Sequence, residues 1–207
     1  MARIMLLYPP GKAYQRSEDR AQCNLDDSAV ATVHACNDIG YAAAVLKGRN
    51  HEVLLKDYQT EQTSFQEVKN DILKFLPDVT VISTTNATIL SDIEFINAVK
   101  EFHNCEFIVK GAIFFNTPIN LLETLDLQNV NYLIGGEIDT VIGDLVDGII
   151  NQNSLDDIPG IIYKLEGTFK KNSFEKWCDK LDEIPFPARD LMKNELYPRP
   201  DTGWTTS

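Results

Sequence analysis

The residues of this sequence best suited to hold a ligand are small, hydroxyl-bearing or glycine residues that directly follow short apolar runs. They form the segments Tyr8-Pro9-Pro10-Gly11, Ser83-Thr84-Thr85-Asn86, Gly111-Ala112 and Gly135-Gly136-Glu137. Glycine lets a backbone approach a large ligand closely, and hydroxyl and amide groups offer neutral hydrogen bonds. These residue types predict a neutral cradle for a ligand, without a set of catalytic charges.

Several kinds of catalytic site are excluded by motifs that the sequence lacks. No GxGxxG follows the first apolar run, and no GxxxxGK[ST] occurs, so the phosphate-binding turns of dinucleotide and P-loop proteins are missing. A phosphoryl receiver would need acidic residues after the first strand, where Tyr8-Pro9-Pro10 stands. There is no GxSxG elbow, and His34, His51 and His103 fall at expected helix or turn positions, so no catalytic triad is predicted.

The cysteines do not have the spacing of a metal or cluster site. Cys23, Cys36, Cys105 and Cys178 are scattered, with no CxxC or CxxxCxxC pattern. We expect reduced structural thiols.

The composition of the chain limits the kinds of partner molecule that we expect. The chain has 207 residues, 43% of them hydrophobic, and carries 19 Lys and Arg against 31 Asp and Glu, a formal net charge of −12. Without a cluster of cations a nucleic-acid partner is not expected. The apolar runs are far shorter than the roughly 20 residues that cross a bilayer, so we expect no membrane partner. No secretory signal is evident, which favours a cytoplasmic location.

Short apolar runs alternate with helical patterns along most of the chain. Strands are expected at residues 3–8, 52–56, 79–83, 107–110 and 130–134. A helix through residues 39–46 should end near Gly48 and Asn50, and another should occupy 140–150. Capping boxes at Ser64 with Glu67 and at Ser91 with Glu94 predict two more helix starts. Thr117-Pro118 predicts an N-cap and first helical residue.

This alternation predicts an α/β fold, a flavodoxin-like doubly wound five-stranded parallel sheet over residues 1–151. Residues 152–207 should add a small hairpin that turns at Glu166-Gly167 and an extended, proline-containing tail. Ligands of such sheets bind beyond the carboxyl ends of the strands, here between the first and third strands. The four segments described first all lie at that edge.

These segments, in their order, give the sequence a family resemblance. It resembles the N-terminal cobalamin-binding domain of cobalamin-dependent radical S-adenosylmethionine enzymes. The stretches that carry the resemblance are Tyr8-Pro9-Pro10, GYAAAVL at 40–46, NHEV at 50–53, Pro77-Asp78-Val79, Ser83-Thr84-Thr85, Gly135-Gly136-Glu137, DIPGI at 157–161 and LDEIPFPARDL at 181–191.

The resemblance implies a cobalamin-binding module of a methyltransferase-type enzyme, a module that binds the cofactor but does not catalyse alone. In that family S-adenosylmethionine and a [4Fe–4S] cluster belong to a C-terminal radical domain with a CxxxCxxC motif, and this sequence ends about where that motif would begin. That domain is therefore the expected protein partner. The implied cofactor-binding residues are Tyr8, Pro9, Pro10, Gly11, Ser83, Thr84, Thr85, Gly111, Ala112, Gly135, Gly136 and Glu137.

Two departures from the family pattern leave an alternative open. The DxHxxG motif, whose histidine binds cobalt in many cobalamin domains, is absent, which also disfavours a stand-alone methyl carrier. Lys110-Gly111-Ala112 stands where many relatives have Gly-Gly-His. The alternative is a doubly wound interaction or regulatory module that has lost cobalamin binding.

Overall fold

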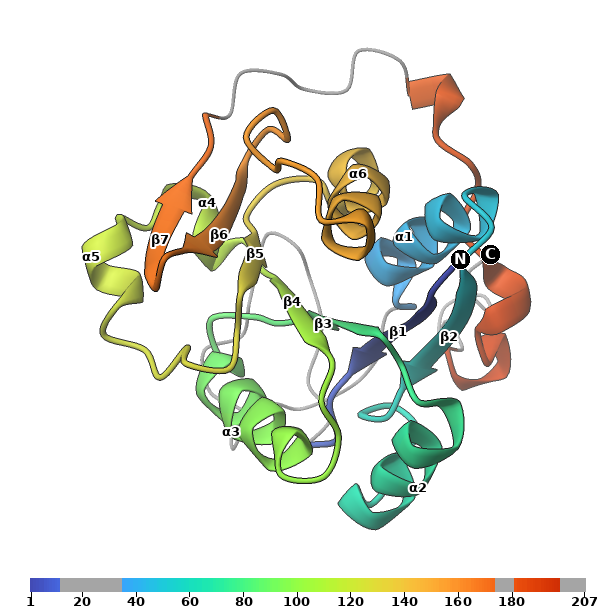
Figure 1. Ribbon diagram of the computed structural model, residues 1–207. Coiled ribbons are helices and arrows are strands. Elements are labelled where there is room, and N and C mark those ends of the chain that lie inside the picture. Colours follow the sequence, from blue (N-terminus) through green and yellow to red (C-terminus); the bar gives the residue numbers. More distant parts are fainter. Residues whose placement is uncertain (12–34, 174–180, 198–207) are drawn as a thin grey trace.

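The computed structural model describes residues 1–11, 35–173 and 181–197. Its centre is one seven-stranded sheet in the order β2-β1-β3-β4-β5-β6-β7, covered by helices on both faces (Figure 1). The strands are β1 (Arg3–Tyr8), β2 (Glu52–Asp57), β3 (Val79–Ser83), β4 (Glu106–Lys110), β5 (Tyr132–Ile134), β6 (Ile161–Leu165) and β7 (Thr168–Lys171). The first five are parallel and have the 2-1-3-4-5 order of flavodoxin-like sheets.

Two helical layers cover the sheet. The helices are α1 (Asn37–Gly48), α2 (Phe65–Phe75), α3 (Ile89–Lys100), α4 (Ile113–Asn116), α5 (Ile119–Leu122) and α6 (Ile138–Asn151). Side chains alternate along each strand, so Leu6 and Tyr8 of β1 pack toward α1 and α6, whereas Leu7 packs toward α2 and α3. The fully buried strands explain the nearly continuous apolar runs in the sequence.

The sheet is larger than the five parallel strands that the sequence predicted. The hairpin of β6 and β7 forms with Glu166 (φ 51°) and Gly167 (φ 84°) at its turn, as expected. However, β6 also pairs antiparallel with β5, with Leu133 opposite Ile162, so the hairpin continues the sheet. This pairing uses the edge of β5 that would otherwise be open and buries the apolar start of β6.

One predicted capping box is confirmed and the other is wrong. Ser64 and Glu67 exchange side-chain and backbone hydrogen bonds at the start of α2. Ser91 instead lies inside α3, and its hydroxyl donates to the carbonyl of Thr88. The helix starts earlier because the amide of Ile89 already donates to the carbonyl of Thr85, in the turn that leaves β3.

The segment after β4 also differs from the prediction. The short helix α4 was not expected from the sequence. Thr117 does not cap the helix that follows, because its hydroxyl donates back to the carbonyl of Ile113. Pro118 is the N-cap of α5, which is only one turn long.

The described part of the C-terminal region, residues 181–197, forms three short 3₁₀ turns (Figure 1). Residues 187–192 contact α1. The amide of Ala188 donates to the carbonyl of Gly40 (2.9 Å), and a Cβ on Gly40 would lie 2.2 Å from Cε of Met192. The Tyr197 hydroxyl donates to Asp57 at the end of β2 (2.7 Å). The expected loop at residues 12–27 lies outside the described residues. Among those described, no helix is long and apolar enough to span a membrane.

Candidate functional site

The carboxyl ends of β1, β3, β4 and β5 bring the four predicted segments to one edge of the sheet. Tyr8 and Ser83 are buried at the last positions of β1 and β3, and Lys110 ends β4. Beyond β1, Pro9 is buried and Gly11 is exposed. The topology therefore collects these residues at the edge where open α/β sheets bind ligands.

A carboxylate that the sequence analysis did not single out joins three of these strands. Asp38, in the first turn of α1, accepts hydrogen bonds from the Ser83 hydroxyl (2.7 Å) and the Tyr8 hydroxyl (3.0 Å). Lys110 Nζ lies 3.3 Å from the same carboxylate. The three partners all end their strands on the face covered by α1 and α6. We call Tyr8, Asp38, Ser83 and Lys110 the Asp38 cluster.

The Asp38 cluster contains two oppositely charged side chains, those of Asp38 and Lys110. Burial by itself would raise the pKa of Asp38, but Lys110 and the hydrogen bonds from Ser83 and Tyr8 outweigh it and hold the pKa below its ordinary value. Asp38 and Lys110 are therefore an ion pair at neutral pH, with side chains only 11% and 19% exposed. The prediction of a neutral rim is wrong at this point, because a buried cation at a strand end requires an acidic partner.

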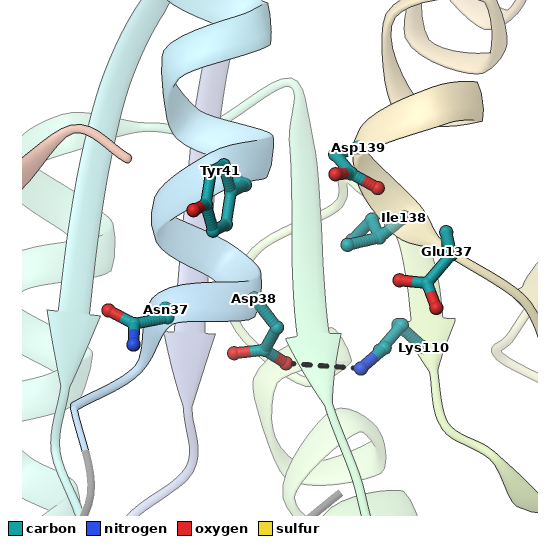
Figure 2. Close-up of a pocket in the computed structure, with 7 residues that line it drawn as sticks. All are labelled: Asn37, Asp38, Tyr41, Lys110, Glu137, Ile138 and Asp139. Atoms are coloured by element: carbon teal, nitrogen blue, oxygen red, sulfur yellow. Dashed lines mark hydrogen bonds and ion pairs between the residues drawn. The ribbon is translucent and has the colours of Figure 1, made fainter. Parts of the chain in front are cut away.

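A pocket of about 210 Å³ opens beside the Asp38 cluster (Figure 2). It lies between the first turns of α1 and α6, with Lys110 projecting from the end of β4. Its lining residues are Asn37, Asp38, Tyr41, Lys110, Glu137, Ile138 and Asp139. Of these residues, only Glu137 is among the predicted site residues.

One carboxylate oxygen of Asp139 is unusual because it accepts no hydrogen bond from the described residues. This atom, Oδ1, is buried and has no hydrogen-bond partner within residues 1–11, 35–173 and 181–197. Buried carboxylate oxygens are ordinarily paired, since an unpaired one loses its hydration without compensation.

Thr84 and Thr85 do not join this pocket. Thr84 is buried on the opposite face of the sheet, where its hydroxyl donates to Oδ2 of Asp92 in α3 (2.6 Å). The amide and the hydroxyl of Thr85 each lie 3.1 Å from the hydroxyl of Thr88. Both threonines thus order the turn between β3 and α3.

Two of the predicted site glycines pack closely against other parts of the chain. A Cβ on Gly111 would lie 2.7 Å from Cγ2 of Thr84, and one on Gly135 would lie 2.5 Å from the backbone nitrogen of Phe115 in α4. The space beside them is occupied by this chain. Ala112 and Glu137 are exposed at the edge, and Gly136 is half-buried. These remain candidates for direct contact with a ligand.

None of the described histidines and cysteines lines the pocket. His51, expected in a surface turn, is buried at the opposite edge of the sheet, where its Nδ1 accepts from the amide of Ala2 (3.3 Å) and its Nε2 lies 3.1 Å from Asp147. Cys36 and Cys105 are buried free thiols. His34, Cys23 and Cys178 lie outside the described residues. In the described part of the chain no three His, Cys, Asp or Glu side chains group as metal ligands.

We compared the chain with protein-family models and with solved structures. No family model matches the sequence. The structure of the cobalamin-dependent S-adenosylmethionine radical enzyme OxsB, with aqua-cobalamin and S-adenosylmethionine bound, superposes with a TM-score of 0.69 and 18% identity, over 92% of this chain and 24% of OxsB. The radical S-adenosylmethionine methyltransferase TsrM from Kitasatospora setae, with cobalamin and a [4Fe–4S] cluster bound, gives a TM-score of 0.63 and 15% identity, over 94% of this chain and 34% of TsrM.

The resemblance drawn from the sequence is confirmed. This chain is similar to cobalamin-dependent radical S-adenosylmethionine enzymes. In sequence it is also 24% identical over 161 residues to the uncharacterized methyltransferase PH0819 of Pyrococcus horikoshii, a match that covers 77% of this chain and 34% of that protein. The chain thus spans between a quarter and a third of the length of these relatives. The alternative of a module that has lost cobalamin binding gains no support from them.

At about 210 Å³ the pocket is smaller than the roughly 300–1,000 Å³ of ordinary ligand pockets, so it would admit a small group and not a whole macrocycle.

Proposed function

We propose that this chain is the cobalamin-binding region of a radical S-adenosylmethionine enzyme of the methyltransferase type. The observation that carries the proposal is the similarity of nearly the whole chain to structures that hold cobalamin. The location of the pocket supports it, because the pocket opens at the ligand-binding edge of the sheet. The similarity to an uncharacterized methyltransferase favours methyl transfer, for which we propose an unactivated carbon or phosphorus centre as acceptor.

The residues of this chain would bind and orient the cofactor. Cobalamin, when bound, supplies a cobalt centre that can carry a methyl group, and the protein supplies orientation and exclusion of water. Ala112, Gly136 and Glu137 are the exposed or half-buried edge residues that would face the corrin. Pro9 and Pro10 would support it from the end of β1. The Asp38 cluster fixes the relative positions of β1, β3 and β4 beneath the ring.

Two further groups of the proposed enzyme would bind elsewhere. A [4Fe–4S] cluster requires cysteine ligands, and these 207 residues contain no CxxxCxxC motif. We propose that the cluster and S-adenosylmethionine bind to a radical domain that packs against the carboxyl edge of this sheet. The chain by itself would then bind cobalamin without turnover.

The experiment is a titration of the purified chain with hydroxocobalamin and with methylcobalamin, followed by the visible spectrum of the corrin. We expect saturable binding with a Kd below about 100 μM. Replacement of exposed Ala112 by Trp places an indole over the edge and should weaken binding at least about tenfold, equal to about 1.4 kcal/mol.

A matched variant controls for the added bulk. Glu101 is also exposed, with a similar backbone conformation, but it follows α3 at the opposite edge of the sheet. Glu101→Trp should bind cobalamin as the original chain does. Absence of binding to a chain that is folded by circular dichroism would refute the proposal, as would equal losses in the two tryptophan variants.

A further inference from the structure

The first turn of α1 has two sides with different neighbours. Three of the residues that line the pocket belong to this turn: Asn37, Asp38 and Tyr41. Cys36, directly before α1, and Gly40 lie four residues apart and therefore on one side of the helix. These two residues contact the segment 181–197, which we call the strap. The same helical turn thus forms part of the pocket wall and part of the surface that the strap contacts.

The strap is held against this turn by a backbone hydrogen bond and by buried side chains. The amide of Ala188 donates to the carbonyl of Gly40 (2.9 Å). A Cβ added to Gly40 would lie 2.2 Å from Cε of Met192 and 3.2 Å from Cβ of Pro187. Ala188 and Met192 are only 6% and 7% exposed. Because glycine weakens a helix, the close approach of the strap explains why a glycine stands in this turn.

Tyr197 fixes the end of the strap beside the start of α1. Its side chain is 1% exposed, and its hydroxyl donates to Asp57 at the end of β2 (2.7 Å) and lies 3.5 Å from Sγ of Cys36. Cys36 occupies the N-cap position of α1, where Ser, Thr, Asp or Asn ordinarily provides a side-chain oxygen. Contact with Tyr197 therefore helps to hold the start of a helix that begins without one of the usual capping residues.

We propose that the strap positions the first turn of α1 for cobalamin, so that docking of the strap and binding of the cofactor at this edge favour each other. The inference rests on the proposed function and names Ala188, Met192 and Tyr197 as positioning residues, which act through α1 and do not line the pocket. When the strap is released, the turn that forms the pocket wall loses one of the surfaces against which it packs. Two sites that bias one structural element are coupled, and the coupling is reciprocal.

The first test releases the strap without changing a residue of the pocket. Ala188→Asp puts a carboxylate into the buried contact with α1, which is unfavourable because the charge loses its hydration. We expect this variant of the 207-residue chain to bind hydroxocobalamin about tenfold or more weakly than the original chain, as followed by the visible spectrum. Phe186→Asp is the matched control, since Phe186 lies two residues away in the strap and is 92% exposed. It should change the Kd by no more than about twofold, and circular dichroism should show both variants folded.

The second test needs no substitution. Exchange of the Ala188 amide with deuterium requires that its hydrogen bond to Gly40 open, so the exchange rate reports release of the strap. Because the coupling is reciprocal, saturating hydroxocobalamin should slow this exchange about tenfold or more, whereas a strap with a structural role alone would exchange at the same rate. The amide of Asn153, which donates to Gly148 near the far end of α6 (3.0 Å), is the comparison and should change by no more than about twofold.

The outcomes separate this inference from the proposed function. If folded Ala188→Asp binds cobalamin as well as the original chain does, or if the cofactor leaves exchange of the Ala188 amide unchanged, the role of the strap is refuted while cobalamin binding stands. Equal losses of affinity in Ala188→Asp and Phe186→Asp would also refute it, because the added charge alone would explain them. If Ala188→Asp does not fold, the exchange measurement decides. If the folded original chain does not bind cobalamin, both proposals are refuted.

Discussion

Asp92 makes the stability of this protein depend on pH in a direction opposite to that of most carboxylates. It lies in the first turn of α3, is 5% exposed, and accepts a hydrogen bond from the Thr84 hydroxyl at 2.6 Å. Burial raises its pKa more than the hydrogen bonds from Thr84 and Thr88 lower it, so the pKa rises from 3.8 to about 6. The folded protein therefore favours the neutral form of Asp92.

The sign of the effect follows from this shift. Well below pH 3.8 Asp92 is protonated in both the folded and the unfolded chain, so its ionisation costs nothing. Between about pH 4 and pH 6 the unfolded chain releases the proton more readily, and folding becomes progressively less favourable. The shift corresponds to about 3 kcal/mol of folding free energy, lost by pH 7.

Asp92→Asn tests this reasoning. The amide is a neutral isostere of the protonated acid, and its oxygen can still accept from Thr84. Urea unfolding at intervals from pH 4 to pH 8 should show the variant more stable than the original chain at pH 7.5, by up to about 3 kcal/mol. The difference should shrink toward zero at pH 4.

The control lies two residues away on the same helix. Glu94→Gln removes an exposed carboxylate and should change the free energy of unfolding by no more than about 0.5 kcal/mol at any pH in this range. If Asp92→Asn is less stable than the original chain at pH 7.5, or if the difference between them does not depend on pH, the burial argument is wrong.

Two further substitutions probe the site and its support. Asp38→Asn removes the carboxylate that pairs with the buried Lys110 ammonium and should cost about 3 kcal/mol at pH 7, measured by urea unfolding. Lys110→Met in the same chain should recover most of this loss, and a double variant no more stable than the single one would contradict the argument. Gly135→Ala brings a Cβ within 2.5 Å of the Phe115 backbone and should lower stability by about 1–3 kcal/mol. Gly48→Ala, with no heavy atom within 4 Å of the added Cβ, should lower it far less; equal losses would contradict the packing argument.

The arrangement of strands could be predicted from the sequence because each strand is short, apolar and followed by a turn residue. The predicted bounds of β1 and β3 match the structure. The continuation of the sheet into β6 and β7 could not be predicted in the same way. A hairpin is recognised by its local turn, here Glu166-Gly167, but its pairing with β5 depends on contacts about 30 residues apart in sequence.

Only some residues of the Asp38 cluster could be predicted from the sequence. Tyr8 and Ser83 were named because they end strands, and Lys110 was noted as a departure from the family pattern. Asp38 was missed because a single acid in the first turn of a helix is commonly explained by the helix dipole. Its hydrogen-bond partners lie 30 and 45 residues away in sequence. A signal was present: a lysine that ends a buried strand requires an anion nearby, and that search would have led to the helix after β1.

The same residue types that suggested ligand contact also serve the fold, and the structure distinguishes the two uses. Thr84, Gly111 and Gly135 are needed where the chain packs against itself, so their replacement tests stability. Ala112 and Asp139 are different, because one is exposed and the other has an oxygen without a partner in the described residues.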